Sequence, residues 1–299
     1  MILTVTLNPT IDKTYEIGDL IDGQVNRVRS VTSIPGGKGI NVARILRQFS
    51  QPVAAMGFLG GYTGRMIEES ILSLGAECHF TRIKGETRTS TNVLADTGYV
   101  TEILEPGPTI SEREFAIFLE EYEYCLGQCN IVALCGSAPL GLPTDIYAKL
   151  ITQAKEAGKK VFLDTSGELL KEGVKARPYL IKPNRKELEY LTGKKLRTRE
   201  EITEEAKQLV KSGIEKVVVS LGSRGLLYVD SRQALFKEAC KVKAVNTVSC
   251  GDSVVASLCM SELAGDSPKE ALRKAAALAA ANACTRESGE IPMEIYMSL

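Results

Sequence analysis

Short apolar runs rich in β-branched residues recur along the chain, and segments whose apolar positions repeat every three or four residues separate them. The runs cover residues 3–7, 53–58, 131–135, 161–163, 179–181 and 217–221, and each predicts a strand buried on both faces. The amphipathic segments cover 41–49, 63–74, 112–126, 144–157 and 200–211, and predict helices. This alternation is typical of a parallel sheet with helices on both faces.

Two regions, 14–34 and 87–104, break this rhythm and show the alternation of half-buried strands. In the second, Asp96-Thr97-Gly98 offers a turn between two strands. We expect a small sheet that projects from the main body and forms a lid over the carboxyl ends of the parallel strands, where open α/β sheets place ligands. The chain would then be a single domain, 1–299, whose lid comes from two insertions.

The segment that follows position 248 predicts a helix that begins with small residues and one carboxylate. Val254, Val255, Leu258, Cys259 and Leu263 fall on one helical stripe, so positions 249–252 would form its first turn. Unpaired N–H groups and the positive end of the helix dipole meet there and can hold an anion. The acid at position 252 is better suited to accept a proton than to bind phosphate. An acid favoured by the dipole, with small residues for packing, is the alternative interpretation.

Composition narrows the function classes. Lys and Arg number 37, as do Asp and Glu, so no overall field favours nucleic acid or an anionic membrane. The start has no basic region followed by a long apolar run, and no eighteen apolar residues run together, which predicts a soluble cytoplasmic protein. Eight cysteines form no CxxC pair and there is one histidine, His79, which argues against zinc and Cys/His nucleophiles. A Ser-His-Asp triad would need His79, which we interpret as a strand or surface residue.

A glycine-rich stretch, PGGKGIN, occupies positions 35–41. A P-loop would require Gly at position 32 and Ser or Thr at position 39, and the residues there are Thr32 and Gly39. A dinucleotide fingerprint fails at Val42, where the third glycine should be, so no nicotinamide cofactor is implied. A flexible turn before a helix remains, with backbone amides, Lys38 and Asn41 able to reach a ligand.

Two further turns follow predicted strands. The stretch 220–225, SLGSRG, is a hairpin turn or a ligand loop. After the strand that ends at 181, Asn184 can cap a helix with Glu187 three residues on, or Glu187 can organise the water shell of Mg²⁺. Because the carboxyl ends of parallel strands meet at one edge of a sheet, we expect these segments to lie together.

These motifs, taken in order, resemble the ribokinase-like, or PfkB-type, carbohydrate kinases over essentially the whole chain. The matching segments are TLNPTID at 6–12, GGKGINVAR at 36–44, KPNRKE at 182–187, SLGSRG at 220–225 and CGDS at 250–253. The stretches VNR at 25–27, GETR at 85–88, TEI at 101–103 and EPGP at 105–108 are similar to the branch that contains 1-phosphofructokinase and tagatose-6-phosphate kinase. The resemblance implies a three-layer α/β/α fold with a mostly parallel sheet and a small β-sheet lid, which often pairs with its equivalent in a homodimer.

The resemblance further implies ATP-dependent transfer of the γ-phosphoryl group, with Mg²⁺, to a hydroxyl of a ketohexose monophosphate. The stretches 12–14 and 184–188 favour fructose 1-phosphate as the substrate and fructose 1,6-bisphosphate as the product. Tagatose 6-phosphate is the alternative. A non-catalytic sugar-phosphate sensor is an alternative of another class, because Ser249 stands where the family usually has glycine and adds a Cβ to the anion-binding turn.

By the same resemblance, Asp252 would be the catalytic base, and the Ser249, Cys250 and Gly251 amides the anion hole. Substrate-binding residues would be Asp12, Gly36, Gly37 and Asn41 for the sugar, and Arg27, Lys38, Arg88 and Ser137 for its phosphate. Nucleotide-binding residues would be Lys182, Asn184, Glu187, Ser220, Gly222, Gly225 and Asn282, with Asn184 and Glu187 reaching magnesium through water.

Overall fold

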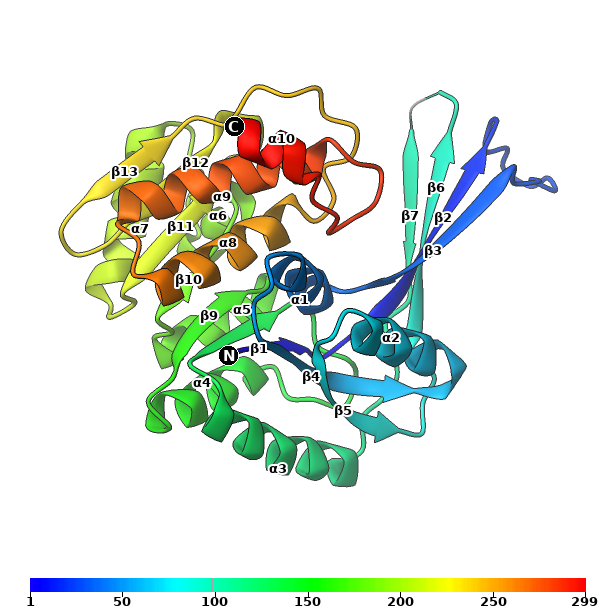
Figure 1. The fold of residues 1–299 in the computed structure, drawn as a ribbon, viewed down its shortest axis with the longest axis horizontal. Coiled ribbons are helices and arrows are strands. Elements are labelled where there is room, and N and C mark those ends of the chain that lie inside the picture. Colours follow the sequence, from blue (N-terminus) through cyan, green and yellow to red (C-terminus); the bar gives the residue numbers. More distant parts are fainter. Residues whose placement is uncertain (98) are drawn as a thin grey trace.

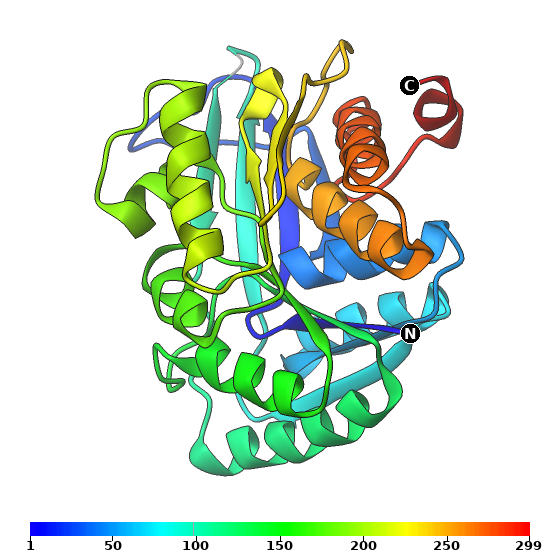
Figure 2. The ribbon, with the colours of Figure 1, turned by 90° about the vertical axis from the view of Figure 1, so that its left-hand side faces the viewer.

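The computed structural model describes residues 1–97 and 99–299, and its centre is a nine-stranded sheet between two layers of helices (Figures 1 and 2). The strand order is β13-β12-β11-β10-β9-β8-β1-β4-β5. The seven strands from β11 to β5 in this order run parallel, and β12 and β13 extend the sheet antiparallel. The strands are β1 (Ile2–Thr6), β4 (Val53–Gly60), β5 (Glu77–Ile83), β8 (Ile131–Cys135), β9 (Lys160–Asp164), β10 (Leu180–Ile181), β11 (Lys216–Ser220), β12 (Leu226–Val229) and β13 (Ala234–Lys237).

The helices cover the two faces of the sheet, as the alternating pattern predicts. One layer contains α1 (Lys38–Gln48), α2 (Gly61–Ser73), α8 (Cys250–Ala264), α9 (Pro268–Ala283) and α10 (Met293–Ser298). The other contains α3 (Glu112–Gln128), α4 (Ile146–Glu156), α5 (Gly167–Gly173), α6 (Arg185–Thr192) and α7 (Arg199–Lys211). Each layer buries its own apolar cluster against the sheet, and the strands are apolar on both faces because both are covered.

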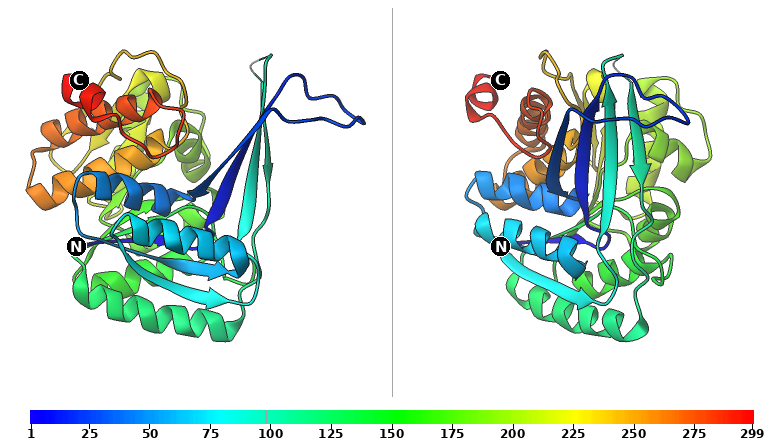
Figure 3. Two further views of the ribbon diagram at one scale, coloured as in Figure 1. Left: turned by 45° about the vertical axis from the view of Figure 1, so that its right-hand side comes forward. Right: turned by 90° about the vertical axis from the view of Figure 1, so that its right-hand side faces the viewer.

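A second sheet of four strands projects from the main body (Figure 3), which confirms the small separate sheet expected from the sequence. Its order is β3-β2-β6-β7, with β2 and β6 parallel and the outer pairs antiparallel. The strands are β2 (Thr10–Ile17), β3 (Ser30–Gly36), β6 (Arg88–Ala95) and β7 (Val100–Leu104). The sheet begins earlier than the boundary expected at 14, so Asp12 lies on it; Gly98 of the expected turn lies outside the described residues.

The connections bring distant segments to one edge of the large sheet. From β1, the chain passes through the second sheet and α1 to β4 on one side, while β8 pairs with β1 on the other. Such a reversal of strand order opens a crevice at the carboxyl ends of the strands. The first turns of α1 and α8 and the ends of β8, β9, β10 and β11 surround it. Among the described residues, no helix has the length and apolarity needed to cross a membrane.

Candidate functional site

The first turn of α8 has two backbone donors available to an anion. Cys250 N–H donates to Thr247 O at 3.4 Å and Ser253 N–H to Ser249 O at 2.9 Å. Among the described residues, the N–H groups of Gly251 and Asp252 between them have no backbone acceptor. Gly251 is one of the three residues whose amides were expected to bind the anion, and the helix dipole adds positive potential at this turn.

Ser249, the residue that departs from the family pattern, caps α8 with φ 64° and ψ 0°. This left-handed conformation is unfavourable for a residue with a Cβ, at a cost of roughly 1–2 kcal/mol. Its Oγ accepts a hydrogen bond from Asn41 Nδ2 at 2.9 Å. Ser249 thus has two effects: its backbone is strained, and its side chain links the turn to α1.

Asp252 is buried in the same turn, with 5% of its surface exposed. Asn41 Nδ2 also donates to its Oδ2, at 2.9 Å, and Arg44 donates to Asn41 Oδ1 at 3.3 Å, which fixes the orientation of the amide. Burial raises the pKa of the Asp252 carboxyl to about 6, against the opposing charge of Lys38. The group is therefore mostly ionised at neutral pH and only weakly hydrated, as a proton acceptor should be.

Asp12 and Gly36 lie side by side on paired strands β2 and β3. A Cβ on Gly36 would lie 2.0 Å from Asp12 Oδ2, so the carboxylate rests directly on the glycine backbone. Burial raises the pKa of Asp12 to about 6, although Arg88 and Arg44 oppose the shift. Gly37, with φ 109°, caps α1 and packs against Thr6. Asp12 and Gly36, two of the residues expected to bind the sugar, are therefore in direct contact.

Three of the four residues expected around the substrate phosphate lie near this surface. Arg88 donates to the backbone oxygen atoms of Asn8 (3.2 Å) and Glu105 (3.0 Å). Asn8 Nδ2 in turn donates to Ser137 Oγ at 3.3 Å, so Asn8 links Arg88 to Ser137. Asn8 belongs to the TLNPTID motif, but the motif alone did not predict a role for it. Lys38 stands at the start of α1 with its side chain 38% exposed.

Arg27, the fourth, lies elsewhere. It is exposed in the segment 18–29, which projects beyond the far end of β2 and β3 (Figure 3). Strand β3 is paired from Gly36 back to Ser30, which is next to this segment, and this stretch spans about 20 Å at ~3.4 Å per residue. In this chain the structure therefore does not bring Arg27 to the other phosphate candidates.

A cavity of about 580 Å³ extends from the α8 turn along the ends of β11 and β12. Its polar rim includes Asn184, Ser220 and the turn with Gly222 and Gly225. A Cβ on Gly225 would lie 2.0 Å from Lys237 O, so only glycine fits there. The apolar part of the lining comes from Val242, Val254, Ala276, Ala279, Ala280 and Ala283. A polar rim with an apolar slot suits the phosphates and the flat base of a nucleotide.

Asn184 and Glu187 form the capping box that the sequence offered as one interpretation. Asn184 Oδ1 accepts from Glu187 N at 3.0 Å, and Asn184 N donates to Glu187 Oε2 at 2.8 Å. The cap anchors both residues at the start of α6, and Asn184 also lines the cavity. The charge of Asp164, and to a smaller extent that of Glu187, raises the pKa of Lys38. The capping box uses Asn184 Oδ1 and Glu187 Oε2, so Glu187 Oε1 remains available to a ligand.

Two predicted site residues have structural partners. Asn282 is 1% exposed, and its Nδ2 donates to Val248 O at 2.8 Å while its Oδ1 accepts from Gly289 N at 3.1 Å. Asn282 therefore anchors the loop that precedes α8, and it is not among the residues that line the cavity. Cys250 does line it, and burial raises the pKa of its thiol although Asn282 donates to its sulfur. The thiol is therefore the form present at neutral pH.

Asp164, which sequence reasoning did not select, lies beneath the site. It ends β9, is 1% exposed, and its Oδ1 is 3.2 Å from both Lys38 Nζ and Lys182 Nζ. The sequence feature that could have identified Asp164 is its position: it is a carboxylate at the end of an apolar strand, at the sheet edge where ligands are expected. Lys182, 4% exposed, also lies against the α8 turn, because a Cβ on Gly251 would be 3.3 Å from its Nζ.

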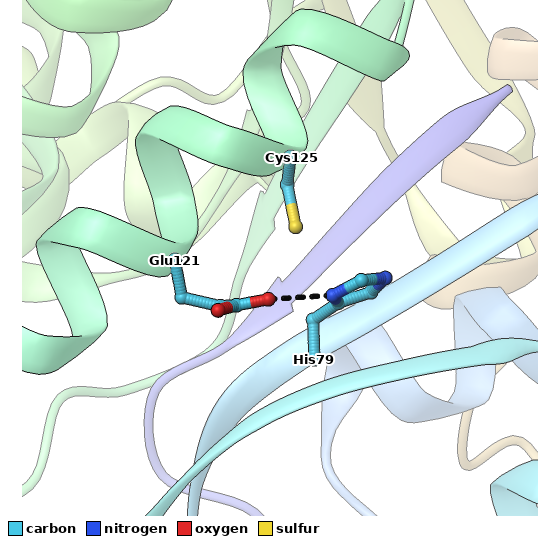
Figure 4. A group of neighbouring side chains, drawn as sticks. All are labelled: His79, Glu121 and Cys125. Carbon is cyan, nitrogen blue, oxygen red and sulfur yellow. Dashed lines mark hydrogen bonds and ion pairs between the residues drawn. The ribbon is translucent and has the colours of Figure 1, made fainter.

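His79 belongs to a separate group, between the edge strand β5 and α3 (Figure 4). Its Nδ1 is 2.7 Å from Glu121 Oε1, and Cys125 completes three potential ligand atoms within 4.8 Å of one another. The sequence argued against a zinc site because the chain has no CxxC pair and only one histidine. Burial raises the pKa of the Cys125 thiol to about 12, so the sulfur is protonated, and a hydrogen-bond contact joins His79 to Glu121. The interpretation of His79 as a strand residue is confirmed.

Comparison with known proteins agrees with this geometry. The family model described as "pfkB family carbohydrate kinase" matches residues 5–295, and the chain belongs to this family. It is therefore a phosphotransferase that acts on a sugar hydroxyl, with ATP as the donor that such kinases use. It is 40% identical over 293 residues to the 1-phosphofructokinase of Bacillus subtilis, covering 97% of this chain and 94% of that protein.

Solved structures show the same architecture. Phosphofructokinase-2 from Escherichia coli in complex with potassium has a TM-score of 0.92 at 27% identity, covering 99% of this chain and 97% of that one. A ribokinase from Thermotoga maritima has a TM-score of 0.83 at 20% identity, over 100% of this chain and 99% of that one. The expected fold, a ribokinase-like α/β sandwich with a second small sheet, is confirmed, and the chain is a sugar-phosphate kinase of the PfkB type.

Proposed function

We propose that this protein phosphorylates fructose 1-phosphate to fructose 1,6-bisphosphate, with ATP as the donor and Asp252 as the catalytic base. The observation that carries the proposal is the position of Asp252: it is a buried carboxylate beside the two available amides of the α8 turn, between the Asp12–Gly36 surface and the nucleotide-sized cavity. The 40% identity to a 1-phosphofructokinase supports fructose 1-phosphate over tagatose 6-phosphate.

The chemistry follows from the arrangement. Asp252 accepts the proton of the sugar hydroxyl, whose oxygen bonds to the γ-phosphorus while the bond to the β–γ bridging oxygen breaks and ADP leaves. The Gly251 and Asp252 amides donate to the transferred group, and Lys38 and Lys182 neutralise negative charge. Asp12 and Asn41 hold sugar hydroxyls, while Arg88, Lys38 and Ser137 hold the phosphate already present. The sugar and ATP then meet in line across one turn of helix.

Asn184 and Glu187 fit a magnesium ion held mainly through water. Their oxygen atoms are the donors that Mg²⁺ prefers, both residues are anchored by the capping box, and Asn184 lines the cavity beside the α8 turn. When bound, the ion would offset the charge of the ATP phosphates.

The second sheet would close over the sugar and pair with its equivalent in a homodimer. Val31 on β3 and Ile103 and Leu104 on β7 are each more than half exposed, so this sheet presents apolar surface to a second copy. Such pairing would also bring Arg27 of one protomer toward the site of its partner, a position that it does not have in its own chain. Closure would exclude water and limit hydrolysis of ATP.

The substrate is tested by ADP release in a coupled assay with ATP, Mg²⁺ and either fructose 1-phosphate or tagatose 6-phosphate. We expect kcat/KM to be at least about tenfold higher for fructose 1-phosphate, a transition-state preference of ~1.4 kcal/mol. A preference for tagatose 6-phosphate would reassign the substrate within the same chemistry. Turnover of neither sugar would favour the non-catalytic sensor.

A further inference from the structure

Two lysines of the site, Lys182 buried and Lys38 partly exposed, share one carboxylate. Lys38 at the start of α1 and Lys182 after β10 each place Nζ 3.2 Å from the same atom, Oδ1 of Asp164. Burial opposes ionisation of Asp164, but Lys182 and Lys38 reverse that effect and hold its pKa below the usual value. The carboxyl group is therefore ionised at neutral pH, and both ammonium groups pair with it.

The two lysines face different parts of the site. Lys38, 38% exposed, lies next to Gly136 and so borders the surface expected to hold the sugar phosphate. Lys182, 4% exposed, lies against Gly251 in the anion-binding turn. Each ammonium has three donors and Asp164 takes one from each, which leaves donors for a ligand on both sides. Asp164 thus pairs with both cations.

Without this carboxylate, the arrangement would be unfavourable. Two ammonium groups close together repel each other, and the repulsion is strong where water is excluded. Lys182, which is 4% exposed, would then be an uncompensated buried charge, which costs several kcal/mol. Among the described residues, Asp164 Oδ2 has no hydrogen-bond partner, so packing alone does not explain a carboxylate at this position.

We propose that Asp164 is a positioning residue for phosphoryl transfer: it holds Lys38 on the acceptor side and Lys182 on the donor side in register with the α8 turn. This inference rests on the proposed function and extends it to a residue that touches neither substrate. Asp164 acts through the two lysines, so replacing it should lower the rate of phosphoryl transfer only when these lysines are present and charged.

A double-mutant cycle tests the inference, with Asp164→Asn, Lys182→Met and the double variant, each checked for folding by circular dichroism and thermal denaturation. We expect each single variant to lower kcat by about 100-fold, as for loss of one preorganised group. The double variant should be no more than about tenfold slower than Lys182→Met, less than the product of the two single losses, because the carboxylate then has only Lys38 left to position. Multiplying losses, or a folded Asp164→Asn variant with kcat within threefold of the parent protein, would overturn the inference. If Asp164→Asn does not fold, the comparison of the double variant with Lys182→Met decides alone.

The pH profile separates positioning from a purely structural loss. Asp252 is acted on by Lys38 and Asn41 of α1, Asp164 of β9 and Lys182 after β10, and it acts in turn on Asp12 of β2. Removing the Asp164 charge should shift the acid limb of kcat/KM to lower pH, because the negative charge of Asp164 raises the pKa of Asp252 and its loss lowers that pKa. The phosphate of the substrate titrates near pH ~6 in both proteins alike and cancels in the comparison. An unshifted limb would contradict the inference. Failure of the parent protein to turn over any sugar phosphate would instead overturn the proposed function.

Discussion

Asn41 donates to Asp252 Oδ2 at 2.9 Å, across 211 positions of sequence. The same nitrogen donates to Ser249 Oγ at 2.9 Å, so one amide holds both the carboxylate and the strained cap of α8. Because α1 also leads out of the second sheet through Gly36, movement of that sheet would reach the proposed base through a single side chain.

Replacing Asn41 should change the pH dependence of catalysis. Its hydrogen bond favours the ionised form of Asp252, so Asn41→Ala should raise the pKa of this group further above about 6. We expect the acid limb of kcat/KM to move to higher pH, with a loss of roughly tenfold at neutral pH. Gln48→Ala, on the same helix but bonded to Gly289 O, is the control and should leave the limb in place. A limb that moves equally in both variants would refute this role.

Asp252 should reduce the stability of the folded protein at neutral pH. Its pKa rises from 3.8 to about 6 on folding, so stability is full below pH ~4, falls between ~4 and ~6 as the unfolded chain ionises first, and stays lower above. Asp252→Asn should therefore raise stability at pH 7.5 by roughly 1–3 kcal/mol and give no gain near pH 4.

Denaturant unfolding at the two pH values measures this effect. Asp266→Asn is a matched control of opposite sign, because Lys274 holds the pKa of Asp266 below its usual value. It should lower stability at pH 7.5. A loss of stability in Asp252→Asn at pH 7.5 would show that its carboxylate is favourably held, contrary to our interpretation.

Two substitutions of Ser249 separate strain from hydrogen bonding. Ser249→Gly removes both the unfavourable φ of 64° and the hydrogen bond to Asn41, so the effects should offset to within about 1 kcal/mol. Ser249→Ala keeps the strain and loses the bond, and should be about 1 kcal/mol less stable than Ser249→Gly. Equal stability of the two variants in urea unfolding would mean that the turn is not strained.

Gly36→Ala should damage binding of the sugar. The added Cβ would lie 2.0 Å from Asp12 Oδ2 and push the carboxylate away. We expect kcat/KM for the sugar phosphate to fall by about 100-fold while the KM for ATP changes little, since misplacement by ~1 Å costs that much. Gly127→Ala on α3, where a Cβ meets nothing within 4 Å, is the control and should keep full activity. An equal effect on both substrates would point to a global defect instead.

Mixed dimers test the proposed role of Arg27. Arg27→Ala and Asp252→Asn should each be impaired alone. If Arg27 serves the partner's site, refolding the two variants together creates dimers with one intact site, so activity returns to a fraction of the parent value. If Arg27 serves its own chain, or if the protein does not pair through the second sheet, the mixture gains nothing over the separate variants.

Much of this site could be predicted because its residues follow apolar runs in order. The periodicity of β1, β4, β8 and β11 placed the glycine turns and the Asp252 turn at one edge without any contact information. Asp164 escaped notice because one Asp at the end of an apolar strand has no motif around it, and its meaning comes from Lys38 and Lys182 far along the chain. For Arg27 the motif suggested a role in phosphate binding. The sequence does not show how far the hairpin that carries Arg27 projects, so its distance from the other phosphate candidates could not be predicted.

The most direct measurement compares ADP release by the parent protein and by Asp252→Asn, with saturating ATP, Mg²⁺ and fructose 1-phosphate at pH 7.5. The account predicts steady turnover by the parent protein and a rate at least ~10²–10⁴-fold lower for the variant, the range for loss of a general base. The variant should remain folded and bind ATP. Comparable rates in the two proteins would contradict the assignment of Asp252 as the base.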